Sequence, residues 1–197
     1  MAAIQVSDSA AAAGCTYAVN GGTFNMDTGA CLGSLVSNGT VVQVDDGGYA
    51  SFGLTADHRW VFGNVTSALV ASAGVVELLS GFKGGLLVDG GEPVASTNKL
   101  VAQRTAVGID AAGRLLLLTV DGSESPPRGA NLTELAVLFA QLGATTALNL
   151  DGGGSTTAWA NGALVDRPTC EDTPVPECER AVASFVCIVP GDNGGAV

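Results

Sequence analysis

Three glycines lie between an aspartate and a serine at residues 151–155, directly after the apolar run 146–150. Such a run is typical of a buried strand, and it would deliver Asp151 and the glycines into a loop at its end. Glycines let a ligand touch the backbone and leave N–H groups free for anionic oxygens. An aspartate beside such a loop can act as base or nucleophile. The segment Asp151, Gly152, Gly153, Gly154 and Ser155 is therefore the first candidate for a catalytic site.

Other polar residues also stand at the ends of apolar runs, where strand ends can converge on one cleft. Arg104 and Thr105 open the run 104–109, and an arginine can hold a phosphate with two parallel hydrogen bonds. Asp121 follows the run 115–120 and is a second candidate carboxylate. The alternative is that Asp-Gly and Asn-Gly pairs are ordinary turns. The remaining candidates are Asn20, Gly21, Gly22, Phe24, Asn25 and Asn149.

Several common sites are excluded by what the chain lacks. The only histidine, His58, falls in a predicted hairpin turn, so neither a Ser-His-Asp triad nor a site with several histidines can form. The glycines at 152–154 lack the lysine and the spacing of a phosphate-binding loop. Nucleotide binding and a metal site built from several histidines therefore have little support.

The charge balance excludes a broad basic surface. The net charge is −11 with only 8 Lys and Arg, which argues against binding of nucleic acid or of an anionic membrane surface. An anionic substrate would need a local cluster of arginine or backbone N–H groups. At 197 residues and 47% hydrophobic, residues 1–197 are expected to form a single domain, and no apolar stretch is long enough to span a membrane.

The cysteines favour an oxidising compartment. The 5 cysteines include no C-x-x-C pair, so disulfides are the preferred interpretation and buried free thiols the alternative. An odd count leaves one thiol over. Residues 1–14 do not resemble a signal peptide, so a secreted form would have lost its leader. Three N-glycosylation acceptors fit the same compartment: Asn38, Asn64 and Asn131.

The elements that would position these residues are mostly strands. Short apolar runs separated by Gly, Asn and Asp predict an α+β fold with a mixed, mostly antiparallel sheet core and many hairpins. One principal helix is predicted at about 131–142, because Asn131 and Glu134 form a capping-box pattern ahead of leucines at helical spacing. Asn161-Gly162 predicts a tight hairpin turn. Strands are expected at 17–20, 33–36, 41–44, 51–54, 60–63, 86–88, 92–94, 105–109, 114–120, 146–150, 156–160, 163–166 and 184–189.

Six motifs in order resemble the phosphodiester glycosidase family. The likeness runs from about Cys15 to Val189, and six motifs in register are far more specific than any one alone. They are Asn20-Gly-Gly-Thr-Phe-Asn25, Gly29-Ala-Cys-Leu-Gly33, Arg104-Thr-Ala-Val-Gly108, Asp121-Gly122, Arg128 to Ala136, and Ala147-Leu-Asn-Leu-Asp-Gly-Gly-Gly-Ser155.

This resemblance implies hydrolysis of a sugar-1-phosphodiester in the secretory pathway. The implied substrate joins the anomeric oxygen of N-acetylglucosamine to a phosphate that also carries mannose O6, and the product is mannose 6-phosphate, a lysosomal sorting signal made in the Golgi. A relative of bacterial type would act on another sugar phosphodiester or an exopolysaccharide. The resemblance also implies the disulfides Cys15 to Cys187 and Cys170 to Cys178. The partner of Cys31, an N-terminal portion and any membrane anchor would then lie outside this sequence.

The expected mechanism divides the site between phosphate and sugar. Arg104 and the N–H groups of 152–154 would hold the phosphate, while Asp151 acts as base or nucleophile at the anomeric carbon. Asn20, Asn25 and Asn149 would bind sugar hydroxyls or orient Asp151. Two other function classes stay open. One is a carbohydrate-binding module that uses the same cleft without catalysis, and the other is a structural domain stabilised by calcium at acidic residues such as Asp45 and Asp46.

Overall fold

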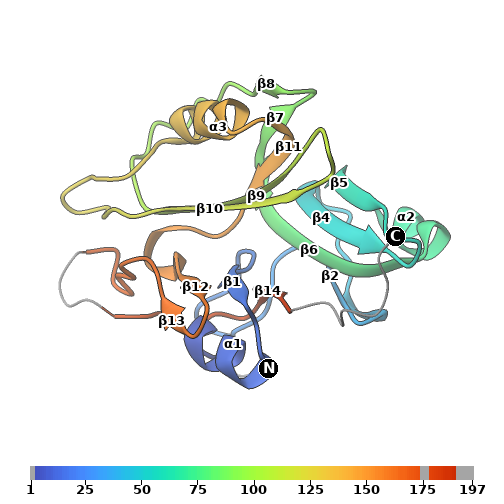
Figure 1. The fold of residues 1–197 in the computed structure, drawn as a ribbon, viewed down its shortest axis with the longest axis horizontal. Helices are drawn as coiled ribbons and strands as arrows, with labels where there is room; N and C mark the ends of the chain where they lie inside the picture. Colours follow the sequence, from blue (N-terminus) through green and yellow to red (C-terminus); the bar gives the residue numbers. More distant parts are fainter. Residues whose placement is uncertain (1–2, 174–177, 190–197) are drawn as a thin grey trace.

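The computed structural model describes residues 3–173 and 178–189, whose strands form three sheets (Figure 1). Neighbouring strands are antiparallel in each sheet, so the prediction of a mostly antiparallel α+β fold is confirmed.

The first sheet joins the two ends of the described chain. Its strands are, in order, β13 (Ala163–Leu164), β12 (Ala158–Ala160), β1 (Tyr17–Asn20) and β14 (Phe185–Ile188). A disulfide from Cys15 to Cys187 fastens β1 to β14, as the family resemblance implied. The turn between β12 and β13 has positive φ at both Asn161 (51°) and Gly162 (93°), which confirms the predicted turn.

The middle sheet carries the principal helix on one face (Figure 1). Its strands are β10 (Leu115–Val120), β9 (Arg104–Asp110), β11 (Ala144–Asn149), β7 (Leu86–Asp89) and β8 (Glu92–Pro93). The helix α3 (Leu132–Gln141) begins at the predicted capping box of Asn131 and Glu134. It buries Leu135, Ala136 and Phe139 against β7, β9 and β11, which fixes the sheet from the side away from the core shared with the other sheets.

The third sheet is centred on a strand that was not predicted. Its strands are β3 (Thr40–Gln43), β2 (Leu35–Ser37), β6 (Val75–Lys83), β4 (Tyr49–Thr55) and β5 (Trp60–Asn64). Glu77, Ser80 and Gly81 interrupt the apolar pattern of β6, which hides it from a search for alternation. Gly81 is needed where β6 passes β11, because a Cβ there would collide with the Asn149 carbonyl.

Two short helices were also not predicted. The first, α1 (Val6–Ala13), has no side-chain cap at Gln5, and its run of alanines carries a weak apolar pattern. The second, α2 (Ser67–Ala73), is capped by Thr66 and buries only Val70. None of the described helices is long and apolar enough to cross a membrane.

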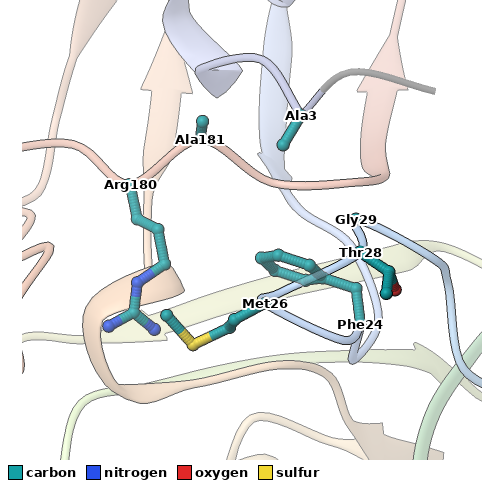
Figure 2. A pocket seen from close by; sticks show the side chains of 7 residues that line it. All are labelled: Ala3, Phe24, Met26, Thr28, Gly29, Arg180 and Ala181. Carbon is teal, nitrogen blue, oxygen red and sulfur yellow. The ribbon is translucent and has the colours of Figure 1, made fainter.

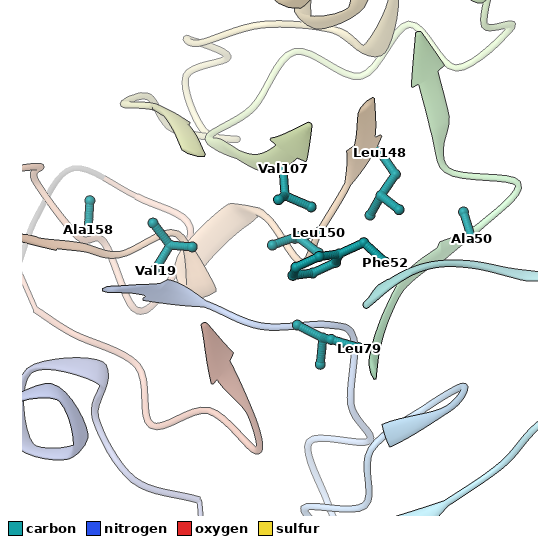
Figure 3. Packing of buried hydrophobic residues seen from close by; sticks show 8 residues of the cluster. All are labelled: Val19, Ala50, Phe52, Leu79, Val107, Leu148, Leu150 and Ala158. Carbon is teal, nitrogen blue, oxygen red and sulfur yellow. The ribbon is translucent and has the colours of Figure 1, made fainter. Parts of the chain in front are cut away.

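The three sheets share one apolar core (Figure 3). Val19 and Ala158 come from the first sheet, and Val107 and Leu148 come from the middle one. The third sheet adds Ala50, Phe52 and Leu79, and Leu150 lies just beyond β11. This packing brings the ends of β1, β9 and β11 together, which are the ends that carry the predicted polar residues.

The three glycosylation acceptors lie in different settings. Asn38 and Asn64 are exposed, while Asn131 caps α3 with its side-chain oxygen. The acidic pair considered for calcium serves as turn and cap residues, since Asp45 accepts from the Gly47 N–H and Asp46 from Ser67. Within residues 3–173 and 178–189, no cluster of three or more His, Cys, Asp or Glu side chains is arranged to hold a metal.

Candidate active site

Asp151 lies just beyond β11 with its backbone fixed on both sides. Its N–H donates to the Gly21 carbonyl at 3.1 Å, and its carbonyl accepts from the Asn20 side chain at 2.8 Å. Burial raises the pKa of Asp151 to about 6, although hydrogen bonds from Ser155 and the Gly152 N–H and the charge of Arg180 oppose the rise. The carboxylate is therefore poised to change protonation near neutral pH.

The Asn20 side chain forms hydrogen bonds with three separate parts of the chain, at Asp151, Thr105 and Thr157. Its side chain is 0% exposed. Besides the bond to Asp151, its oxygen accepts from the Thr105 hydroxyl at 2.6 Å and from the Thr157 N–H at 3.2 Å. Because both polar atoms of the side chain bond within the protein, Asn20 positions Asp151 and keeps Thr105 in the same network.

The glycine loop, Gly152–Gly154, makes close contacts that only glycine permits. A Cβ would lie 2.8 Å from the Gln103 carbonyl at Gly152, 2.6 Å from Asp172 Oδ1 at Gly153 and 2.5 Å from the Arg180 guanidinium at Gly154. The N–H of Gly153 donates to the Gln103 carbonyl, and that of Gly154 donates to Asp172. The N–H groups of Gly153 and Gly154 thus bond within the protein and fasten the loop to the Gln103 backbone and the Asp172 carboxylate.

Arg104 lies next to the glycine loop, because a Cβ at Gly152 would lie 3.8 Å from its Cδ. Its side chain is buried, and its guanidinium donates to the Ala130 carbonyl at 2.9 Å and the Leu100 carbonyl at 2.5 Å. Burial lowers the pKa of Arg104, and the nearby Glu124 carboxylate opposes this effect. Two of its nitrogen atoms, Nε and Nη2, therefore bond to backbone carbonyls of neighbouring segments.

Arg180 is the charged side chain that sequence reasoning missed. Its Nη1 donates to Ser155 Oγ at 3.4 Å, and its charge lowers the pKa of Asp151. Nε and Nη2 donate to the Cys170 carbonyl at 3.1 and 2.7 Å, and Nη2 pairs with Asp172 at 3.3 Å. The only sequence signal was its scarcity, since the chain has just 8 Lys and Arg. Its proximity to the glycines depends on the fold and cannot be seen in the sequence.

A disulfide that closes a short loop lies next to this arginine in the sequence. The Cys170 to Cys178 bond is present, as the resemblance implied, and Arg180 follows it by two residues. Asp172, in the same loop, has a left-handed backbone with φ of 60° and bonds to both the Gly154 N–H and Arg180. Cys31 is a free, half-buried thiol among the described residues, and burial raises its pKa.

Asp121 faces a different carboxylate. It is exposed and accepts from the Arg167 N–H at 3.0 Å. The pKa of Asp166 is raised to about 7. Burial is the largest cause of this rise, and the charge of Asp121 adds to it. Asp121 and Asp166 thus form an acidic pair, and neither is among the groups that shift the pKa of Asp151.

The remaining predicted binding residues serve mainly in packing and turns. Gly21 and Gly22 have no room for a Cβ beside Ser184 and Ser80. Asn25 accepts from the N–H groups two and three residues ahead and shapes a turn. Asn149 is buried at the end of β11, and its side-chain oxygen has no hydrogen-bond partner among the described residues.

Phe24 and Arg180 face a common pocket of about 410 Å³ (Figure 2). The guanidinium lies on one side of it beside Met26, and Phe24 and Thr28 lie on the other. A phosphate at Arg180 would therefore have open space next to it. The site as a whole combines a half-buried carboxylate of raised pKa, a guanidinium in contact with Ser155 and this adjoining pocket.

Comparison with known proteins gives a consistent result. The family model described as phosphodiester glycosidase matches residues 13–189. N-acetylglucosamine-1-phosphodiester alpha-N-acetylglucosaminidase is 37% identical in Mus musculus and 35% identical in Homo sapiens, in each case over 93% of this chain. The chain spans only 39% of the length of each of these two relatives.

A solved structure agrees with these relatives. The zebrafish catalytic domain of the same enzyme, described as auto-inhibited by its pro-peptide, superposes with a TM-score of 0.86 at 31% identity. That match covers 96% of this chain and 68% of the other. Together with the family model, it shows that this chain belongs to the phosphodiester glycosidase family.

Proposed function

We propose that this chain hydrolyses a sugar-1-phosphodiester at the bond between the anomeric carbon and the phosphate oxygen. The observation that carries the proposal is the placement of Asp151, Ser155 and Arg180 in one hydrogen-bonded and charged group beside a pocket. A carboxylate can react at the sugar while a guanidinium balances the charge that develops on the phosphate.

The reaction breaks one bond and forms one. Water adds to the anomeric carbon, the bond from that carbon to the phosphate oxygen breaks, and the electron pair leaves with the phosphate monoester. This leaving group has a second pKa of ~6, so it needs charge stabilisation more than a proton. Arg180 supplies that stabilisation in this proposal, and Arg104 and Asn20 hold the surrounding loops.

Asp151 has two possible roles, which differ in stereochemistry. As a base it takes the proton from the attacking water, and the released sugar has the inverted anomeric configuration. As a nucleophile it forms a glycosyl intermediate that water then opens, and the configuration is retained. Proton NMR of the sugar, recorded as soon as it is released, distinguishes the two roles.

The family relatives suggest the particular substrate. Their names describe removal of alpha-N-acetylglucosamine from a 1-phosphodiester. We propose the same sugar here, released from N-acetylglucosamine-1-phospho-6-mannose to expose mannose 6-phosphate. The two disulfides suit the oxidising lumen of the secretory pathway, and we propose the Golgi as the location.

The direct test is to incubate the protein with N-acetylglucosamine-1-phospho-6-(methyl mannoside). We expect free N-acetylglucosamine by chromatography and conversion of the phosphodiester to a monoester by phosphorus NMR. Asp151→Asn should lower turnover by at least about a thousandfold with an unchanged melting temperature. Near-normal turnover in this variant would refute the role of Asp151, and release of glucose or galactose alone from matched diesters would point to another sugar.

The pH profile gives an independent check. Asp151 must be ionised to act, and its pKa is raised to about 6. We therefore expect kcat/KM to hold above this value and to fall as the pH drops through about 6. A profile that stays flat down to pH 4 would exclude an essential carboxylate of raised pKa.

A further inference from the structure

The pocket beside Arg180 extends the site in one direction. It is lined by Ala3, Phe24, Met26, Thr28, Gly29, Arg180 and Ala181. Its volume of about 410 Å³ lies within the range of about 300–1,000 Å³ that is usual for pockets binding small molecules. Arg180 is 15% exposed, and it connects the pocket to Ser155 and Asp151.

One wall of the pocket is a short loop held by its own hydrogen bonds. The Asn25 N–H donates to the Ala30 carbonyl, and the Gly29 N–H donates to the Asn25 carbonyl, each at 2.8 Å. The Asn25 side chain accepts from Asp27 and Thr28, and Phe24 bridges to Cys31. Such a loop presents Phe24, Met26 and Thr28 in fixed positions, so little order need be gained on binding.

The order of groups along a phosphodiester determines which part of the substrate reaches this pocket. In the proposed function, the anomeric carbon lies at Asp151 and the phosphate at Arg180. Met26 and Phe24 line the pocket beside the Arg180 guanidinium (Figure 2), so the group on the other phosphate oxygen has space to lie against them.

We propose that this pocket is the subsite for the aglycone, and that it fits a hexose joined to the phosphate through its O6. The inference rests on the proposed function and adds the residues that select the leaving group. The ring of Phe24 and the thioether of Met26 offer an apolar surface for the C–H face of a sugar. The Thr28 hydroxyl accepts from the Ala30 N–H, which leaves its own hydrogen to donate to a sugar oxygen.

Filling the pocket tests this assignment. Met26 is 68% exposed, so Met26→Trp should fold while its larger side chain occupies the space. We compare two substrates that share N-acetylglucosamine-1-phosphate and differ in the aglycone, methyl mannoside or methyl. The ratio of kcat/KM for the mannoside to that for the methyl diester should fall at least tenfold in Met26→Trp and about threefold in Thr28→Val.

The control places the same substitution on a distant surface. Leu142, 57% exposed at the end of α3, is changed to Trp and should leave the ratio as in the unmodified protein. An unchanged ratio in Met26→Trp, or an equal loss with both substrates, overturns the aglycone assignment.

A binding measurement separates this inference from the proposed function. Calorimetry with methyl mannoside 6-phosphate, the product monoester, should show at least tenfold weaker binding to Met26→Trp. If the unmodified protein hydrolyses neither diester, the proposed function fails, and the calorimetry alone decides whether the subsite exists. Equal binding by both proteins overturns it.

Discussion

The two halves of the candidate site are held together by different forces. The half around Asp151 depends on buried hydrogen bonds from Asn20, which join β1, β9 and the glycine loop. The half around Arg180 depends on a disulfide and on bonds to the Cys170 carbonyl within one short segment. The carboxylate is therefore coupled to the stability of the whole sheet core, whereas the guanidinium can be displaced without unfolding that core.

The largest effect should come from removing the guanidinium. Arg180→Ala should lower kcat/KM by about a thousandfold, or about 4 kcal/mol in the barrier, with a nearly unchanged melting temperature. Arg180→Lys keeps the charge without the fork and should recover only part of the loss. The buried Arg104 provides the contrast, because the main effect of Arg104→Ala should be a lower melting temperature. If both alanine variants lost only stability, Arg180 would have no role in the reaction.

The next effect concerns the buried amide of the Asp151 half. Asn20→Ala leaves the Thr105 hydroxyl, the Thr157 N–H and the Asp151 carbonyl without this partner, so we expect a loss of about 3 kcal/mol in the free energy of unfolding. Urea denaturation measures it. Asn25→Ala, in an exposed turn, should cost less than about 1 kcal/mol. Equal costs would show that the network does not carry the stability assigned to it.

A smaller effect should follow from opening the short disulfide. The double change Cys170→Ser and Cys178→Ser releases the carbonyl to which Arg180 bonds, and kcat/KM should fall about tenfold, or about 1.4 kcal/mol. Circular dichroism should still show the folded sheets, since Cys15 to Cys187 stays closed. Full activity in this variant would mean that Arg180 holds its position without the bridge.

The smallest effect concerns the acidic pair outside both halves. The pKa of Asp166 is raised to about 7 in the folded protein, whereas its ordinary value is 3.8. Between these two pH values the folded protein holds a proton at Asp166 that the unfolded chain has released. Its stabilising contribution is therefore present at low pH and lost as the pH rises through about 7. The melting temperature of Asp166→Asn minus that of the unmodified protein should grow from pH 5 to pH 8. A constant difference would contradict the raised pKa.

The sequence allowed the Asp151 half to be predicted far better than the Arg180 half. Asn20, Thr105 and Asp151 stand at the ends of apolar runs, and a pattern along the chain is enough to find them. Arg180 and Asp172 follow no strand and lie in a segment rich in Pro, Cys and acid, whose contacts depend on the path of a loop. The same limit explains β6, since its burial on both faces comes from the sheets around it.

Pairing of β1 with β14 has a consequence for biosynthesis. The Cys15 to Cys187 bond spans 172 residues, and β14 supplies a neighbour for the strand that carries Asn20. A nascent chain that has emerged only as far as the glycine loop has neither this strand nor Arg180. The hydrogen-bonded network around Asp151 and the position of Arg180 are therefore complete only after β14 has been synthesised, has paired with β1 and has been fastened by the Cys15 to Cys187 bond.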